Sequence, residues 1–443
     1  MSSVADPPLL FDFGSPFTTI TSGFSRKGRN EVTLIWCKNL QIHLLSVNIM
    51  EREEGMFQTI ISTISSFMYS KLLVIILIGA GVYFTVRTRF PQVRLFKRAC
   101  GSVMEKPEDK EAISSFQALM VSTASRVGTG NIVGVSSAIC IGGFGSVFWM
   151  WVIAIIGSAS ALIESTLAQI YKKRGEDGSC YGGPAYYIEA ALHCRPLAIV
   201  FCVAMILTYA FGFNMLASYN LQSTFSVFSF YNAEMSPWII GGILAVLTGW
   251  CLLGGGSRIV KVASMVVPVM GIAYIGISLL VVIVNIQNVP AMFVRIFEEA
   301  FNFRAIFGAF SGSAMMQGIR RGLYSNEAGI GSAPNASASA NVSHPVKQGL
   351  VQMLSVFIDT LLLCTATAMM CMSSGIDPAK ELQGAPWVQA SLQESLGSFG
   401  PVFITVATVF FAFTTLLGNC FYCDNLLIYI HKKQPGKAFM KGF

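Results

Sequence analysis

The stretch SRVGTGNIVGVSSA, residues 125–138, decides how the rest of this chain is interpreted. It belongs to a long apolar run that begins near Phe116, yet it holds Gly128, Gly130 and Gly134. Each glycine costs a helix interior about 1 kcal/mol relative to alanine. We therefore predict a helix that stops and restarts within the membrane. In lipid, the freed backbone groups are tolerated only where they line a cavity or face protein, and such breaks are typical of ligand and ion sites in secondary transporters.

A second stretch, RGLYSNEAGIGSA at residues 321–333, resembles the first. One shift of 195 positions superimposes identical residues of the two stretches, which are Arg126 and Arg321, Asn131 and Asn326, Gly134 and Gly329, Ser137 and Ser332, and Ala138 and Ala333. The same shift places Glu164 on Asp359, and each is an acid within an otherwise apolar segment. One offset that holds across two successive segments predicts two structural repeats.

The composition of the chain indicates a polytopic membrane protein. Of its 443 residues 53% are hydrophobic and 12% are charged, and the mean hydropathy is +0.60. Soluble proteins carry about a quarter charged residues. The net charge of +7 does not indicate nucleic-acid binding, because the basic residues lie in short loops between apolar segments. The CxxC motif of Cys420 and Cys423 lacks a second pair, so no metal centre is expected there. Neither a Ser/His/Asp set nor a phosphate loop is found, and we predict that the chain is not an enzyme and needs no cofactor beyond a coupling ion.

Nine apolar segments are long enough to be membrane spans. They cover about residues 66–84, 116–140, 147–171, 197–218, 237–253, 263–286, 306–322, 345–372 and 402–422. Lys and Arg cluster in the loops after the first, third, fifth, seventh and ninth spans, and the opposite loops are nearly free of them. Since positive charge favours the cytoplasm, these five loops are predicted to be cytoplasmic.

The spans divide into an extra helix and two repeats. The first span, with its basic linker, falls in residues 56–110, the first five-helix repeat in residues 111–290 and an incomplete second repeat in residues 291–443. An odd number of spans per repeat gives the two repeats opposite orientations in the membrane. Residues 1–55 are expected to be a poorly structured extension. Two core helices of the second repeat are missing from this count, so we expect a truncated C-terminus.

Several long motifs resemble one transporter family. They are SRVGTGNIVGV (125–135), GGFGSVFWMWVIAIIGSASALIESTLA (142–168), GGPAYYIE (182–189), RRGLYSNEAGIGSAP (320–334), HPVKQGLVQM (344–353), FIDTLLLCTATA (357–368) and FAFTTLLGN (411–419). They occur in order over about residues 56–422 and are similar to the alanine or glycine:cation symporter family. The resemblance implies an all-α integral membrane protein with a LeuT-like inverted repeat of five plus five helices and one extra N-terminal helix. It also implies sodium-coupled uptake of alanine or glycine.

The chain departs from this family in two places. Family members continue past residues 411–419 with two more spans, whereas here CFYCDNLLIYIHKKQPGKAFMKGF ends the chain. The alternative prediction is therefore a truncated, transport-inactive membrane protein of the same family. Family members also often carry a glutamine in the fourth span that contacts the substrate amine. Ala217 aligns there, and Asn214, with Asn220 and Gln222 nearby, is the candidate substitute.

A small-ligand site is predicted at the two breaks. At the first break, Gly128, Thr129, Gly130 and Asn131 would offer free N–H groups and a helix N-terminus to a substrate carboxylate. The alternative is that the glycines only allow close helix packing. The expected residues at a second break are Gly312, Ser313, Met316 and Gln317. Ser313 and Gln317 would bind the ammonium and Met316 would limit side-chain size; here too a packing face is the alternative.

The resemblance also implies a sodium site. In the LeuT-like fold, carbonyls of the first core helix and paired hydroxyls of the eighth form the cage. By this analogy Ala124, Val127 and Phe411 supply carbonyls, and Thr414 and Thr415 supply hydroxyls. The alternative for such a threonine pair is a hydroxyl that bonds to a carbonyl one turn back in its own helix.

Two buried acids and one loop complete the candidates. Intramembrane acids are costly and usually functional. Glu164 and Asp359 would either relay a proton or cation or, as we favour, pair with Arg126 or Arg321. Asn326 and Glu327 could latch an inner gate. The sequence thus predicts a multi-pass protein of the plasma membrane, in a bacterium the inner membrane, that imports small neutral amino acids with sodium by alternating access. Its partners would be the amino acid, sodium and the lipid bilayer.

Overall fold

The computed structural model describes residues 58–65, 67–68, 72–105, 107, 112–175, 179–302 and 313–432. The chain forms two compact units, Met1–Met68 and Tyr69–Phe443. In the first unit, residues 58–65 are helical. The predicted extension of residues 1–55 lies outside the described residues. Everything that follows concerns the second unit.

The predicted break in the second apolar segment is confirmed. Helix α5 (Ser115–Arg126) begins with a capping box between Ser114 and Gln117, and α6 (Gly130–Gly142) begins after three residues that are not helical. Val127 leaves the helical region with φ −81° and ψ 87°. Buried side chains surround both helices, so the freed backbone groups face protein.

The predicted role of the third glycine in this break is wrong. Gly134 lies within α6, one turn after Gly130. None of Gly128, Gly130 and Gly134 has a positive φ. Glycine stands at these positions because neighbouring atoms leave no room for a side chain, and not because the backbone needs a conformation that only glycine tolerates.

Helix α7 (Gly145–Ile170) is the centre of one half of the bundle. It packs against α2 (Leu73–Arg87), α15 (Ala314–Asn326) and α17 (Pro345–Val356). Glycines allow the closest of these contacts, since a Cβ at Gly318 would lie 2.2 Å from the Ser146 carbonyl oxygen. The α17 helix continues through η5 (Phe357–Cys364), a π-helical segment, into α18 (Thr365–Ser373).

Helix α20 (Phe399–His431) organises the other half. It packs against α5, α10 (Phe213–Phe225), α12 (Gly255–Val284) and α19 (Ala385–Leu396). The α10 helix continues α9 (Arg195–Ile206) through the π-helical segment η2 (Leu207–Gly212). Helix α11 (Ser236–Leu252) contacts α12 and α20.

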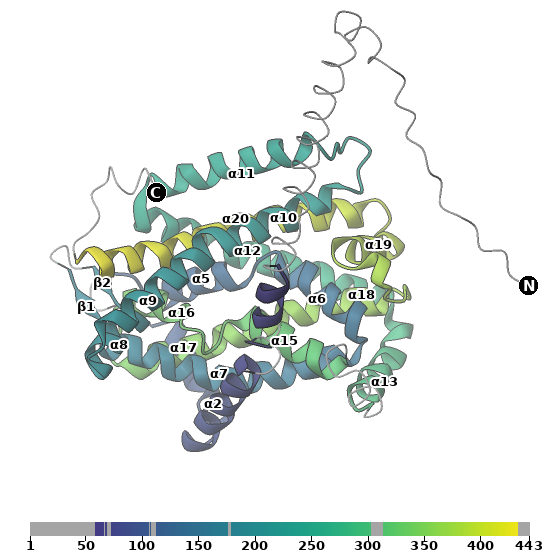
Figure 1. Cartoon of the computed structure of the whole chain (residues 1–443). Coiled ribbons are helices and arrows are strands. Elements are labelled where there is room, and N and C mark those ends of the chain that lie inside the picture. The colour runs from purple at the N-terminus through teal and green to yellow at the C-terminus, as the bar shows by residue number, and fades with distance from the viewer. Residues whose placement is uncertain are drawn as a thin grey trace, which may run out of the picture. The chain divides into compact units, whose positions relative to one another are not determined.

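The remaining elements are short and lie between the long helices. They are α3 (Pro91–Arg94), α4 (Phe96–Val103), β1 (Lys173–Arg174), β2 (Cys180–Tyr181), α8 (Pro184–Leu192), η3 (Ile286–Asn288), α13 (Val289–Ala300), α16 (Ala333–Ser339) and η6 (Lys380–Leu382). Strands β1 and β2 pair antiparallel, with Lys173 opposite Tyr181. Figure 1 shows α8, β1 and β2 at one end of the long helices and α13, α18 and α19 at the other. By the distribution of basic residues, the first end is the predicted cytoplasmic one.

The helices are apolar enough for a multi-pass membrane protein. Among the described residues five helices could each span a bilayer, namely Gly145–Ile170, Arg195–Phe225, Gly255–Val284, Pro345–Ser373 and Phe399–His431. Three shorter apolar helices are α2, α6 and α11. Large apolar side chains such as Trp238 and Ile272, 83% and 73% exposed, cover the outer surfaces of α11 and α12, as expected for lipid-facing helices. The first predicted span, 66–84, corresponds to α2, which starts later and ends at Arg87. The total of nine spans stays a prediction.

The shift of 195 positions between the two repeats does not superimpose the two places where a helix is interrupted. A shift of 195 positions places residues 127–129 on residues 322–324, which lie within α15. The described chain instead leaves the helix at residues 327–332, where Glu327, Gly329 and Gly331 have φ values of 49°, 87° and 85°. The second motif therefore encodes a left-handed connection between α15 and α16, which needs glycine for its backbone angles.

Candidate substrate and cation site

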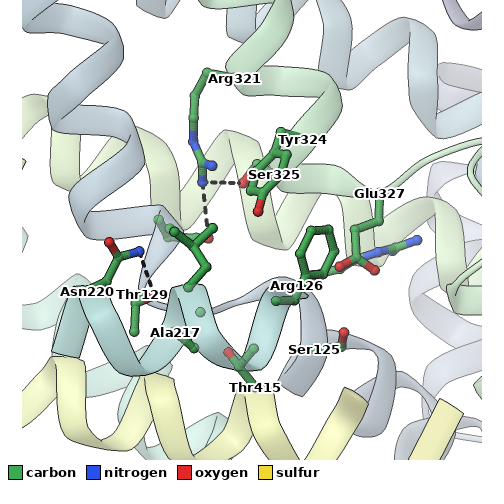
Figure 2. A pocket seen from close by; sticks show the side chains of 15 residues that line it. Ser125, Arg126, Thr129, Ala217, Asn220, Arg321, Tyr324, Ser325, Glu327 and Thr415 are labelled. Carbon is green, nitrogen blue, oxygen red and sulfur yellow. Dashed lines mark hydrogen bonds between the residues drawn. The ribbon is translucent and has the colours of Figure 1, made fainter. Parts of the chain in front are cut away.

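A small cavity of about 50 Å³ lies at the break between α5 and α6. Its walls come from the break itself and from α10, α15 and α20 (Figure 2). The lining residues are Ser125, Arg126, Gly128, Thr129, Gly130, Asn131, Phe213, Leu216, Ala217, Asn220, Arg321, Tyr324, Ser325, Glu327 and Thr415. All four residues predicted at the first break, 128–131, are among them.

The break offers free backbone groups to this cavity. Within the described chain, no acceptor is found for the backbone N–H groups of Gly128, Thr129 and Gly130. These groups precede or begin α6, where the helix dipole is positive. The combination is suited to an anionic group such as a carboxylate.

Arg321 explains the second and third glycines. A Cβ at Gly130 would lie 3.2 Å from Arg321 Nη1, and one at Gly134 would lie 2.9 Å from it. The guanidinium therefore rests on the backbone face of α6. Its Nη2 donates to the Ser325 hydroxyl at 3.0 Å and reaches Asn131 Oδ1 at 3.5 Å (Figure 2).

Asp359 holds the break to α15 and η5. Its buried carboxylate accepts hydrogen bonds from Asn131 Nδ2 at 2.7 Å and from the hydroxyls of Ser325 and Thr360, each at 2.8 Å. The predicted direct pairing with Arg321 is wrong, because no ion pair joins them in the described structure. Ser325 and Asn131 link the two charges instead, since both contact Asp359 and Arg321.

The residues of the predicted sodium site are buried where α20 meets the end of α5. A Cβ at Gly128 would lie 2.4 Å from Thr415 Oγ1, so this hydroxyl sits directly against the break. Thr415 Oγ1 donates to the Phe411 carbonyl at 2.7 Å, and Thr414 Oγ1 lies 3.0 Å from the Phe410 carbonyl and 3.2 Å from the Phe411 carbonyl. These are the bonds within one helix that the alternative predicted. The oxygen lone pairs of both threonine hydroxyls remain available. The carbonyls of Ala124 and Val127 are available as well, because no backbone N–H in the described chain donates to them.

The fourth predicted span contributes Asn220 rather than Asn214. Asn220 Nδ2 donates to Thr129 Oγ1 at 3.1 Å and lines the cavity, as does Ala217. Asn214 does not line it; its side chain bonds to Asn419 at 2.8 Å and to the Ala210 carbonyl. Lining positions at 213, 216, 217 and 220 form one helical face, and residue 214 points about 100° away from residue 213.

The residues predicted at the second break do not meet the cavity. Ser313 caps α15 by accepting from the Met316 N–H at 3.3 Å, and Met316 is buried. Gln317 lies against Gly142 at the far end of α6. None of the three lines the cavity, because Arg321 follows Ser313 by about 12 Å of helix rise. Gly312 lies outside the described residues.

Glu164 supports the connection after α15. Its two carboxylate oxygens accept the N–H groups of Gly329 and Gly331, each at 3.2 Å. The predicted direct pairing with Arg126 is wrong, since the described residues contain no such ion pair, although the charge of Arg126 acts on this carboxylate. Glu164 therefore fixes the left-handed glycines that carry Glu327 to the cavity.

Sequence reasoning missed the charged lining of the cavity. The sequence indicates Arg126 and Arg321 only as a repeated pair and as partners of buried acids, and Glu327 only as part of an inner gate; it gives no reason to single out Tyr324 or Ser325. A signal was present, since Gly130 and Gly134 stand one turn apart and leave a groove wide enough for a guanidinium. Only the packing of α15 on α6 identifies which guanidinium fills it.

Comparison with known proteins agrees with this picture. The sequence model of the sodium:alanine symporter family matches residues 54–443. The amino-acid carrier protein AlsT of Bacillus subtilis is 43% identical over 378 residues, which cover 85% of this chain and 79% of AlsT. The probable sodium/glutamine symporter GlnT of the same organism is 41% identical over 86% of this chain and 79% of its own length. The sodium/alanine symporter AgcS of Methanococcus maripaludis is 36% identical and covers 84% of both chains. A match of this extent places the chain in the sodium:alanine symporter family.

Proposed function

We propose that this protein imports small neutral amino acids, alanine or glycine, together with sodium by alternating access. Its fold is then the LeuT-like inverted repeat with one extra N-terminal helix, and its place is the plasma membrane, in a bacterium the inner membrane. One observation carries the proposal: a helix break whose free N–H groups border a small cavity lined by hydroxyls and two arginines, with the Thr415 hydroxyl directly against the break.

The substrate carboxylate is assigned to the N–H groups of Gly128, Thr129 and Gly130. Asn131 holds the start of α6 in place through Asp359, and Asn220 orients Thr129 toward the cavity. Ala217, Leu216 and other apolar side chains leave little room for a long substrate side chain.

Sodium is assigned to the carbonyls of Ala124, Val127 and Phe411 and the hydroxyls of Thr414 and Thr415. Neutral oxygens from two helices that meet at a break are the ligands that such transporters provide for sodium. Thr415 lies against Gly128, which is itself one of the carboxylate donors. Ion and substrate would therefore share the same short stretch of backbone, which gives each a direct means to raise the affinity of the other.

Glutamine is the second candidate substrate, because GlnT is about as similar to this chain as AlsT is. A cavity of about 50 Å³ has room for only a few water-sized groups. This size favours alanine and glycine over the longer carboxamide side chain of glutamine.

The test is a sodium-gradient uptake panel of alanine, glycine and glutamine with the full chain in proteoliposomes, beside equilibrium binding of alanine with and without sodium. We expect sodium-dependent binding and uptake of alanine, both lost in Thr414→Val/Thr415→Val. Alanine binding that ignores sodium would remove the sodium assignment, and preferential glutamine binding would remove the assignment of a small substrate.

A further inference from the structure

The Arg126 side chain is buried without a hydrogen-bond partner. It ends α5 and is 3% exposed, and none of its Nε, Nη1 and Nη2 atoms finds an acceptor among the described residues. A buried donor without an acceptor costs about 1–3 kcal/mol, and more when it is charged. An arginine in this state needs an acceptor that the polypeptide does not supply.

A carboxylate stands near Arg126 without touching it. Glu327 is 4% exposed, and the charge of Arg126 acts on it, yet the described structure contains no ion pair between them. Glu327 Oε2 accepts the Ser332 hydroxyl at 2.6 Å. The backbone of Glu327 has a left-handed φ of 49°, which brings its side chain to the cavity wall. Both residues line the cavity, so two opposite charges that do not pair with each other face the same space, which suits a dipolar ligand.

Two tyrosine hydroxyls lie close to Glu327, behind the cavity wall. Tyr209 and Tyr422 are both buried; the Tyr209 hydroxyl faces Glu327 and Ser332, and the Tyr422 hydroxyl faces Ser125. Their rings pack edge to face with centroids 5.5 Å apart. Both lie close enough to Glu327 to feel its charge. The two tyrosines thus support Glu327 and Ser125 from behind, and at this wall of the cavity the Arg126 guanidinium is left without an acceptor among the described residues.

This charged pair lies on the predicted inner side of the cavity. Figure 2 shows Asn220 and Thr129 on one side and Arg126 and Glu327 on the other. Along α15, Glu327 follows Arg321 by about 9 Å of helix rise toward the predicted cytoplasmic end. A substrate that leaves the N–H groups of α6 for the cytoplasm would meet Arg126 and Glu327 next.

We propose that Arg126 and Glu327 form a second, inner subsite that holds the zwitterionic amino acid before its release. Arg126 binds the carboxylate and Glu327 binds the ammonium. The inference rests on the proposed function, because it requires an amino-acid substrate that crosses the cavity. It differs from a gate in which Arg126 and Glu327 pair with each other, since a gate makes no contact with substrate.

The test compares the two sides of the membrane in right-side-out and inverted vesicles. The variants are Arg126→Gln and Glu327→Gln, with Arg320→Gln as the matched control, because Arg320 is a half-buried arginine of α15 that does not line the cavity. A melting temperature close to that of wild type establishes that a variant is folded. We expect the KM for alanine on the cytoplasmic face to rise at least tenfold in both variants, and the KM on the external face to change less than threefold. Equilibrium fixes the ratio of Vmax/KM for uptake to Vmax/KM for efflux, so the ratio of the maximal uptake rate to the maximal efflux rate should fall in proportion.

Alaninamide, used as a competitor on the cytoplasmic face, assigns the charges. It lacks the carboxylate, so Arg126→Gln should weaken alanine at least tenfold more than alaninamide, whereas Glu327→Gln should weaken both. KM values that rise equally on both faces, or equal weakening of alanine and alaninamide in Arg126→Gln, would mean a gate or a structural role and overturn the inner subsite. Unchanged KM values on both faces would mean that water rather than substrate lies beside Arg126 and Glu327, and would also overturn the inner subsite. A wild-type protein without sodium-dependent alanine binding would instead refute the proposed function.

Discussion

Gly128→Ala tests whether the break and α20 are held at contact distance. The new Cβ would lie 2.4 Å from Thr415 Oγ1, about 1 Å inside ordinary van der Waals contact. The hydroxyl cannot move freely, because it donates to the Phe411 carbonyl at 2.7 Å. The helices cannot separate easily either, since Gly418 packs directly on the backbone of Ser125 three residues further along α20. Such overpacking costs about 1–3 kcal/mol, which is the expected loss in free energy of unfolding.

A double-mutant cycle isolates this contact. Thr415→Ala removes the hydroxyl and leaves Thr415 Cβ at an ordinary 3.5 Å from the new methyl group. Unfolding in mixed micelles should therefore show Gly128→Ala/Thr415→Ala to be about as stable as Thr415→Ala alone, a coupling of about 1 kcal/mol or more. Gly79→Ala is the matched control, because nothing lies within 4 Å of its Cβ position. Additive losses in the double mutant, or a fully stable Gly128→Ala, would refute the close approach.

Three further substitutions test the site and its surroundings. Asn220→Ala frees Thr129 from its 3.1 Å hydrogen bond, so alanine affinity in equilibrium binding should fall about five- to twentyfold; an unchanged affinity would remove Asn220 from the site. Gly143→Ala should lower the melting temperature clearly, because residue 143 has a φ of 83° and the new Cβ would lie 2.3 Å from Glu299 Oε2. Adding Glu299→Ala should restore only the part of the loss that is due to the clash and not the part due to backbone strain. The Tyr429 hydroxyl donates to Glu189 at 2.6 Å and lowers the pKa of that carboxyl, so the contact stabilises the fold above the unfolded-state pKa and is lost as pH falls through the folded-state pKa. Tyr429→Phe should therefore reduce the acid-induced drop in melting temperature, and an unchanged pH profile would contradict this.

Asn214→Ala is the matched control for Asn220→Ala. Asn214 lies on the same helix and is also hydrogen-bonded, but it faces Asn419 rather than the cavity. We expect it to lower stability by about 1–3 kcal/mol through the unpaired Asn419 and to leave alanine affinity within twofold. Equal losses of affinity in both variants would show that the assay reports folding rather than the site.

The break at residues 127–129 could be predicted from the sequence because its cause is local. Glycines with polar neighbours in an apolar run disfavour a continuous helix whatever surrounds them. The reason for each glycine could not be predicted in the same way. Gly128 makes room for a hydroxyl from α20 and Gly130 for a guanidinium from α15, and both partners are distant in the sequence.

The wall residues of the cavity were harder to predict because they depend on helix phase. Asn214 and Asn220 are chemically equal candidates, and only the rotation of α10 after η2 turns Asn220 inward. On α15 the small polar residues near Ser313 looked like a binding segment, but they begin the helix some two turns before the cavity. A local motif identifies a helix start, whereas the depth of that start depends on packing against α7.

The buried charges around the cavity connect sodium binding with substrate binding in the proposed mechanism. Arg126 and Arg321 face three carboxylates, Glu164, Glu327 and Asp359, and the described structure contains no direct ion pair among them. If all three carboxylates were ionised, the group would carry one negative charge in excess, which is costly in a buried site and which a proton or a cation would remove. A zwitterionic amino acid is neutral and cannot compensate it, whereas a sodium ion beside Thr415 brings the total to zero. In the proposed mechanism, coupling would then follow from electrostatics: sodium would stabilise the site that the substrate needs, and by reciprocity the substrate would retain the sodium.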